Sequence, residues 1–152
     1  MKAIHALTQA GSLAAGLHDG RARYRYFLHS AVNTAALWGL HDGDGWVSLT
    51  DAHGGRQLPV WPNPVCARLC AHGARVHGVP ARIGLQDFLD VWLRDMAALE
   101  VGVDVFATPL RPGFVVSARQ CREHLLACLA DRDWEPPQDA GWPDFPIHPG
   151  AS

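Results

Sequence analysis

Four cysteines and nine histidines are the residues of this chain best suited to chemistry. Cys66 and Cys70 are four residues apart, and Cys121, His124 and Cys128 have helical spacing, so each set lies on one face of a predicted helix. Two such helices could meet around zinc. Neither set has the two-residue spacing of a zinc knuckle, and both helices need these positions for their core faces. We therefore expect no metal site in this chain.

Thiol catalysis would need a cysteine with a nearby base and a lowered pKa. Cys70 has His72 close in sequence, and Cys121 has His124 one turn away. Pairs of this kind arise by chance in a chain with nine histidines, so we interpret the four cysteines as inert core thiols. A small hydrolase or transferase that uses a histidine or cysteine base is the alternative function.

Other short motifs do not indicate a cofactor. The sequence Asp42-x-Asp44-Gly45 is similar to the start of a calcium loop, but Trp46 occupies the next ligand position and no glutamate follows at the required distance. The sequence His53-Gly54-Gly55 has no Gly-x-Ser-x-Gly after it and fits a hairpin turn. No glycine-rich phosphate loop occurs either. We therefore expect no bound cofactor.

Six tryptophans are the least ordinary feature of the composition. Trp38, Trp46 and Trp61 lie on neighbouring predicted strands, and Asn63 follows in a corner with two prolines. Rigid aromatic side chains next to proline lose little conformational freedom on binding, although the same residues also serve as core anchors. We predict that Trp38, Trp46, Trp61 and Asn63 belong to a binding surface. The predicted function is a non-enzymatic protein-binding module, regulatory or immunity-like, with a protein partner.

Composition limits the classes of partner. The chain has 152 residues, 48% of them apolar and 18% charged, as expected for one globular domain with its own core. Its net charge of -2 provides no overall field for nucleic acid or for an anionic membrane. Neither a targeting segment nor a membrane span is recognisable, so we expect a cytoplasmic protein with reduced thiols.

Periodicity predicts a mixed order of helices and strands, hence an α+β domain with a mainly antiparallel sheet packed by three to four helices. Residues 1–18 could form a short helix, residues 19–131 form the domain, and residues 132–152 form a proline-rich extended tail with Trp142 or Phe145 docked in an apolar groove. The strongest local signals are the helix starts at Asn63-Pro64 and Ser117, and the first of these helices should end at Gly73. Residues 41–45 are a predicted turn, followed by predicted strands at Trp46 to Thr50 and Gln57 to Trp61. Pro59 places the second of these strands at an edge or a bulge. Expected core residues are Phe27, Leu49, Leu69, Phe88, Trp92, Phe106 and Leu125.

Several segments keep a recognisable order along the chain. They are Arg23-Tyr24-x-Tyr26-Phe27, Trp38-Gly39-Leu40, Gly45-Trp46, Leu58-Pro59-Val60-Trp61-Pro62, Leu85-x-x-Phe88-Leu89-x-x-Trp92-Leu93 and Val105-Phe106-x-Thr108-Pro109. From about Asp19 to Asp131 this pattern resembles the bacterial family known as domain of unknown function 2750. Asn63 stands where that family leads us to expect histidine. The resemblance implies the fold and a cytoplasmic location, and it implies no activity.

Overall fold

The computed structural model describes residues 19–71 and 77–137. Four of our predictions lie outside these ranges. They are the short helix within residues 1–18, the pairing of Cys70 with His72, the helix end at Gly73, and the docking of Trp142 or Phe145.

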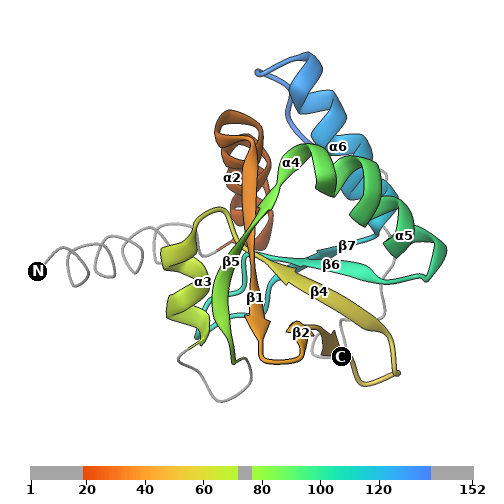
Figure 1. Cartoon of the computed structure of the whole chain (residues 1–152). Coiled ribbons are helices and arrows are strands. Elements are labelled where there is room, and N and C mark those ends of the chain that lie inside the picture. Colours follow the sequence, from red (N-terminus) through yellow and green to blue (C-terminus); the bar gives the residue numbers. More distant parts are fainter. Residues whose placement is uncertain (1–18, 72–76, 138–152) are drawn as a thin grey trace, which may run out of the picture.

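Helices and strands alternate irregularly along the described part of the chain (Figure 1). The helices are α2 (Gly20–Thr34), α3 (Pro64–Ala71), α4 (Leu85–Asp87), α5 (Leu93–Ala98) and α6 (Ala118–Ala130), and the π-helical turn η1 (Phe88–Trp92) joins α4 to α5. The strands are β1 (Ala36–Asp42), β2 (Gly45–Trp46), β3 (Leu49–Thr50), β4 (Arg56–Val60), β5 (Val79–Gly84), β6 (Gly102–Val105) and β7 (Phe114–Val116). The chain is therefore an α+β domain, as predicted.

The strands form two sheets. One has the order β2-β1-β5 and the other has the order β3-β4-β6-β7. All pairs are antiparallel except β4 with β6. We did not predict this parallel pair. The two strands are far apart in sequence, since α3, β5 and the whole α4–α5 helical region lie between them.

A pair of tryptophans joins β1 of one sheet to β4 of the other. Trp38 on β1 and Trp61 at the end of β4 exchange both backbone hydrogen bonds, with N···O distances of 2.9 and 2.8 Å. The strands on either side of this junction then diverge (Figure 1). Because the two residues are directly opposed across antiparallel segments, their side chains lie on the same face.

Residues 45–50 fill the space between the diverging strands. We predicted one strand from Trp46 to Thr50, and this prediction was wrong: β2 pairs with β1, β3 pairs with β4, and Val47 and Ser48 cross between the sheets. The Val47 amide donates to Leu40 O at 2.8 Å, so it does not continue the β3–β4 ladder. If the β3–β4 ladder continued, Val47 would lie opposite Pro59, which has no backbone N–H to donate. The proline therefore occupies the point where β4 has no strand neighbour on that side.

Proline has the same role on β5, the outer strand of the three-stranded sheet. The amide of Leu85 donates to Ala35 O at 3.0 Å, so the alternation of the ladder directs the backbone of Pro80, Arg82 and Gly84 away from β1. Pro80 thus lacks an N–H at a position that faces outward.

Local capping signals were confirmed. Asn63 Oδ1 accepts from the Cys66 amide at 2.8 Å at the start of α3, and Ser117 Oγ accepts from the Gln120 amide at 3.1 Å at the start of α6. Both bonds satisfy amides that have no partner inside the first helical turn.

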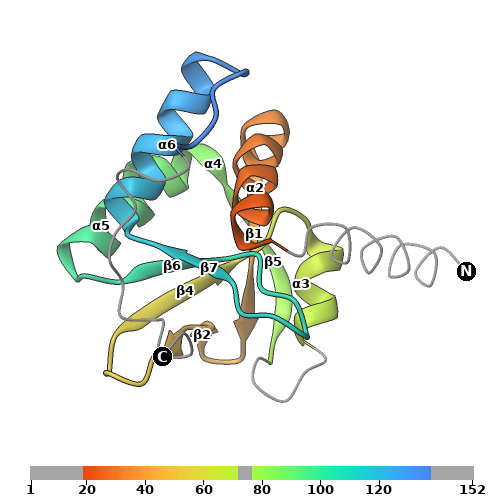
Figure 2. The same ribbon diagram turned by 180° about the vertical axis from the view of Figure 1, so that it is seen from behind.

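Helices cover both sides of the strands. Helix α3 lies beside β1 and β5, while α2 and α6 lie next to each other above the β6–β7 side (Figures 1 and 2). Of the expected core residues, Phe27, Phe88, Phe106 and Leu125 are buried. Leu49, Leu69 and Trp92 are only half-buried and pack against the rim of the core, which corrects our prediction. Leu49 lies on a two-residue edge strand, and Trp92 faces the exposed end of the three-stranded sheet.

Candidate functional site

The structure separates the four predicted binding residues into two places. Trp38 and Trp61 form the junction between the sheets, and Asn63 follows two residues later. Trp46 pairs with His41 on β1, and His41 and Trp38 are three residues apart on one strand, so their side chains lie on opposite faces. The tryptophans therefore do not form one continuous surface.

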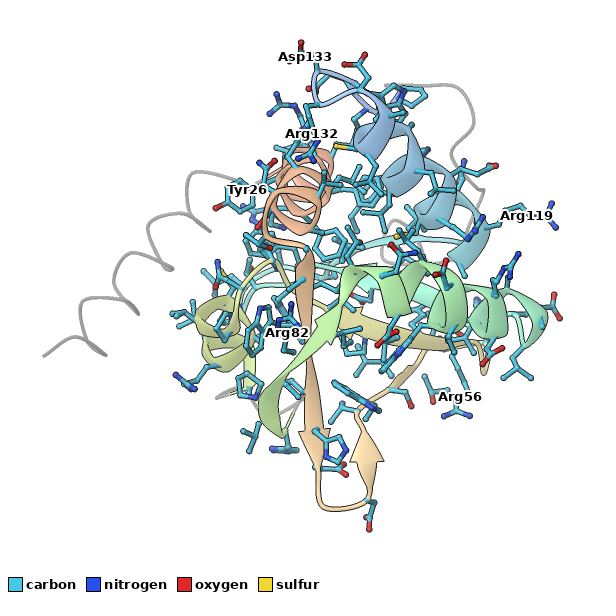
Figure 3. All side chains as sticks on the ribbon, turned by 45° about the horizontal axis from the view of Figure 1, so that its top comes forward. Tyr26, Arg56, Arg82, Arg119, Arg132 and Asp133 are labelled. Atoms are coloured by element: carbon cyan, nitrogen blue, oxygen red, sulfur yellow. The ribbon has the colours of Figure 1, made fainter. Side chains whose placement is uncertain are left out.

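The residues at the junction are engaged within the domain. Trp61 is fully buried, and its indole Nε1 donates to Ala107 O at 2.9 Å. The side-chain oxygen of Asn63 is the helix cap of α3. Trp38 is half-buried between Trp61 and its cross-strand neighbour Arg82, which Figure 3 shows on the α3 side of the sheet. Of the four predicted residues, Trp46 is the most accessible to another molecule.

Trp46 belongs to an exposed row at the end of the three-stranded sheet. Trp46, His41 and Val79 are directly opposed on β2, β1 and β5, so they share one face. Trp46 is 36% exposed and Val79 is 67% exposed. Together with Trp92 we name these residues the exposed ledge (His41, Trp46, Val79 and Trp92).

Three contacts fix the Trp46 ring. Its centroid lies 4.9 Å from that of Trp92 at an interplanar angle of 81°, and 5.3 Å from that of His41 at 78°. Both are edge-to-face arrangements, which aromatic rings favour. Beneath the ring lies Gly39, where an added Cβ would be 3.2 Å from two ring carbons of Trp46. The glycine therefore provides the space in which the indole rests on the backbone of β1.

The π-helical turn η1 positions Trp92 on the ledge. Its wider turn changes the direction of the following side chains and releases carbonyl groups from the regular helical pattern. The carbonyl of Leu89 accepts from Arg122 Nε on α6 at 3.0 Å. Phe88 supports Trp92 from below, with ring centroids 6.3 Å apart. Side-chain bonding from α6 thus anchors the helical turn that carries Trp92.

Sequence reasoning missed His41 and Trp92 as neighbours of Trp46. For His41 a signal existed, because a tight turn at Asp42–Gly45 places residues 41 and 46 opposite each other. For Trp92 no comparable local signal exists, because several helices and strands separate η1 from β2 along the chain.

The cysteines are buried, as we predicted for core thiols. All four are free. Burial raises the pKa of the Cys66 thiol to about 11 and that of Cys121 to about 12, and it also raises the pKa of Cys128. A thiol with a raised pKa is a poor nucleophile at neutral pH.

A buried polar cluster connects α2 to α6. Tyr24 Oη and His124 Nδ1 are 2.8 Å apart, and Cys121 is a further hydrogen-bond partner of Tyr24. Burial lowers the pKa of His124 and raises that of Tyr24 well above its ordinary value. Both shifts favour the neutral forms, so the cluster joins two helices through uncharged hydrogen bonds.

Residues 19–71 and 77–137 contain no group of three or more histidine, cysteine or carboxylate side chains arranged to hold a metal ion. The two cysteine-bearing helices of our sequence analysis, α3 and α6, lie in different parts of the domain (Figures 1 and 2).

Comparison with known proteins gives one match. The model of a protein family described as protein of unknown function (DUF2750) matches residues 24–125. No curated protein and no solved structure matches the chain.

Proposed function

The chain belongs to the DUF2750 family, and within that family we propose that it is a non-enzymatic protein-binding module, regulatory or immunity-like, whose contact surface is the exposed ledge. The observation that carries the proposal is the Trp46 ring, 36% exposed and fixed against Trp92, His41 and Gly39. A large aromatic side chain that is already ordered loses little entropy when a partner covers it.

The surroundings of the ledge indicate the chemistry of the partner. Arg56 on β4 is exposed, and its Nη2 donates to Ser48 Oγ at 3.2 Å, two residues beyond Trp46 (Figure 3). A partner that covers Trp46 and extends to Ser48 would meet this guanidinium group. We propose a protein partner that presents an apolar side chain followed by a carboxylate.

Two observations favour binding over the alternative of a small hydrolase or transferase. All four cysteines are buried, and the pKa of the thiol is raised at Cys66, Cys121 and Cys128. His124, which lies one helical turn after Cys121, already forms a hydrogen bond with Tyr24. The ledge itself contains one titratable side chain, His41, whereas general acid–base or nucleophilic catalysis normally requires an oriented second group.

A bacterial, cytoplasmic setting is part of the same proposal. Four free cysteines suit a reducing compartment, where thiols are kept from pairing. Within the described ranges, no helix combines the length and the apolar character needed to cross a membrane.

Site-directed photo-crosslinking tests the proposed surface. A benzophenone amino acid placed at Val79, on the ledge, should capture a protein partner in cells, whereas the same group at Leu110, an exposed residue elsewhere, should not. The captured partner is then purified and titrated with the wild-type protein. Trp46→Ala should weaken this affinity by at least about tenfold, because a central aromatic contact typically contributes about 2 kcal/mol or more.

Leu110→Ser is the matched control, since it also removes an exposed apolar side chain and should bind as the wild type does. Equal capture from both positions, or unchanged affinity of a folded Trp46→Ala variant, would exclude the ledge as the binding surface.

A further inference from the structure

Residues 131–137 fold back from the end of α6 and lie against α2. We name this segment the C-terminal strap. Arg132 Nη1 donates to Asn33 Oδ1 at 2.9 Å, and Figure 3 shows Arg132 and Asp133 at this end of the helix pair. Glu135 forms an ion pair with Arg25, and the ring of Trp134 lies 5.3 Å from that of His124. The strap thus touches both helices through a few side chains.

A thiol and an imidazole meet beneath the strap. Cys128 Sγ on α6 lies 3.5 Å from His29 Nδ1 on α2. The other ring nitrogen of His29 is 3.4 Å from a carboxylate oxygen of Glu135. The order thiol, imidazole, carboxylate is the order in which a base is oriented toward a nucleophile. The carboxylate belongs to the strap, whereas the other two groups belong to the helices.

The strap carries the charged groups that act on the sulfur. Cys128 is fully buried, and Arg132, Glu135 and Asp131 all belong to the strap. Burial is the largest cause that raises the pKa of the thiol; Glu135 and Asp131 also raise it, and Arg132 lowers it. Opening of the strap would take these three charged groups away from the thiol and leave His29 in place on α2.

We propose that Cys128 is a modification site for low-molecular-weight disulfides, protected by the closed strap and assisted by His29 when the strap opens. The site is independent of the exposed ledge. Cys121, which lies seven residues earlier on the same helix, bonds to Tyr24 inside the core and cannot be uncovered in this way. Short surface segments open locally at a much lower free energy than the whole domain unfolds.

The reaction is thiol–disulfide exchange. His29 takes the proton of the Cys128 thiol, and the thiolate attacks one sulfur of glutathione disulfide. A new sulfur–sulfur bond forms, the old one breaks, and the second glutathione leaves as a thiolate that takes up a proton. One disulfide is consumed and one is formed, so no further oxidant is required.

Mass spectrometry of the full chain after incubation with glutathione disulfide tests the site. In the native protein, peptide mapping should find the adduct at Cys128 before any at Cys66, Cys70 or Cys121. Trp134→Ala should raise the rate by about tenfold, because it removes the aromatic contact that holds the strap closed. In that background His29→Gln should lower the rate again without changing the melting temperature, an effect that a purely structural histidine would not have.

The urea dependence of the wild-type rate provides a second measurement that needs no variant. Local opening exposes little surface and predicts a weak dependence, whereas global unfolding predicts a steep one. Adducts that form at all four cysteines together, a steep urea dependence, or a rate unaffected by His29→Gln would overturn the proposal. The binding test at the ledge uses none of these residues, so either proposal can fail without the other.

Discussion

Two pairs of tryptophans lie on opposite faces of β1, and they differ in burial and in the contacts that they make. Trp38 and Trp61 exchange backbone hydrogen bonds, and the Trp61 indole is fully buried with its N–H bonded to Ala107. Trp46 and Trp92 meet through their rings, and Trp46 remains 36% exposed. The first pair fastens two sheets together, whereas the second forms an ordered surface that nothing in the described part of the chain covers fully.

The difference shows that residue type alone does not separate a structural tryptophan from a binding one. A buried indole stabilises the fold through apolar burial and one satisfied donor. An indole that is half exposed contributes less to folding and retains area for a partner. The two pairs should therefore respond differently to substitution.

Trp61→Ala should produce the largest loss of stability. It empties a fully buried site and leaves the Ala107 carbonyl without its donor, which together cost about 3–5 kcal/mol in comparable cores. Urea denaturation followed by circular dichroism measures the effect. A loss no larger than that of Trp46→Ala would remove the distinction between the two pairs.

Gly39→Ala should have an intermediate effect at the other pair. The added methyl group would meet the Trp46 ring at 3.2 Å, so the ring must shift, at a cost of about 1–3 kcal/mol. The same change should cost less in a Trp46→Ala background, because the obstacle has gone. Additive effects in this double-mutant cycle would show that the indole does not rest on Gly39.

The sequence predicted the parts of this comparison that depend on neighbours along the chain. The caps at Asn63 and Ser117 and the turn between β1 and β2 were readable because each requires only a few consecutive residues. The parallel pairing of β4 with β6 was not readable, since it depends on where α3 and the α4–α5 region fold. The opposite faces of Trp38 and Trp46 follow from this turn and from the alternation along β1, whereas the positions of Trp61 and Trp92 depend on the long-range arrangement.

His124→Gln tests the helix side of the molecule, where a fifth indole, Trp134, lies on His124. Because burial lowers the pKa of His124, the unfolded chain binds this proton more readily than the folded chain does. The wild type should therefore lose stability as the pH falls below about 6.5, the ordinary pKa of histidine, and the variant should lose less. Chemical denaturation between neutral and acidic pH measures the slope. An equal slope in the two proteins would mean that His124 does not control it.

Val79→Ser should have the smallest effect on folding. The side chain is 67% exposed, so its replacement should change stability by less than about 0.5 kcal/mol. Affinity for the captured partner should nevertheless fall, since Val79 belongs to the same row as Trp46. A large loss of stability would indicate that the ledge is part of the core, and the difference between the Trp46–Trp92 pair and the buried Trp38–Trp61 pair would then not hold.

The proline of β5 has a consequence for the behaviour of the protein in a crowded solution. Pro80 withholds an amide on the outer side of this edge strand, where the backbone of another chain could pair. Intermolecular strand addition needs a run of donors and acceptors, and at this edge one donor is absent. Aggregation by edge-to-edge pairing is thereby discouraged at β5.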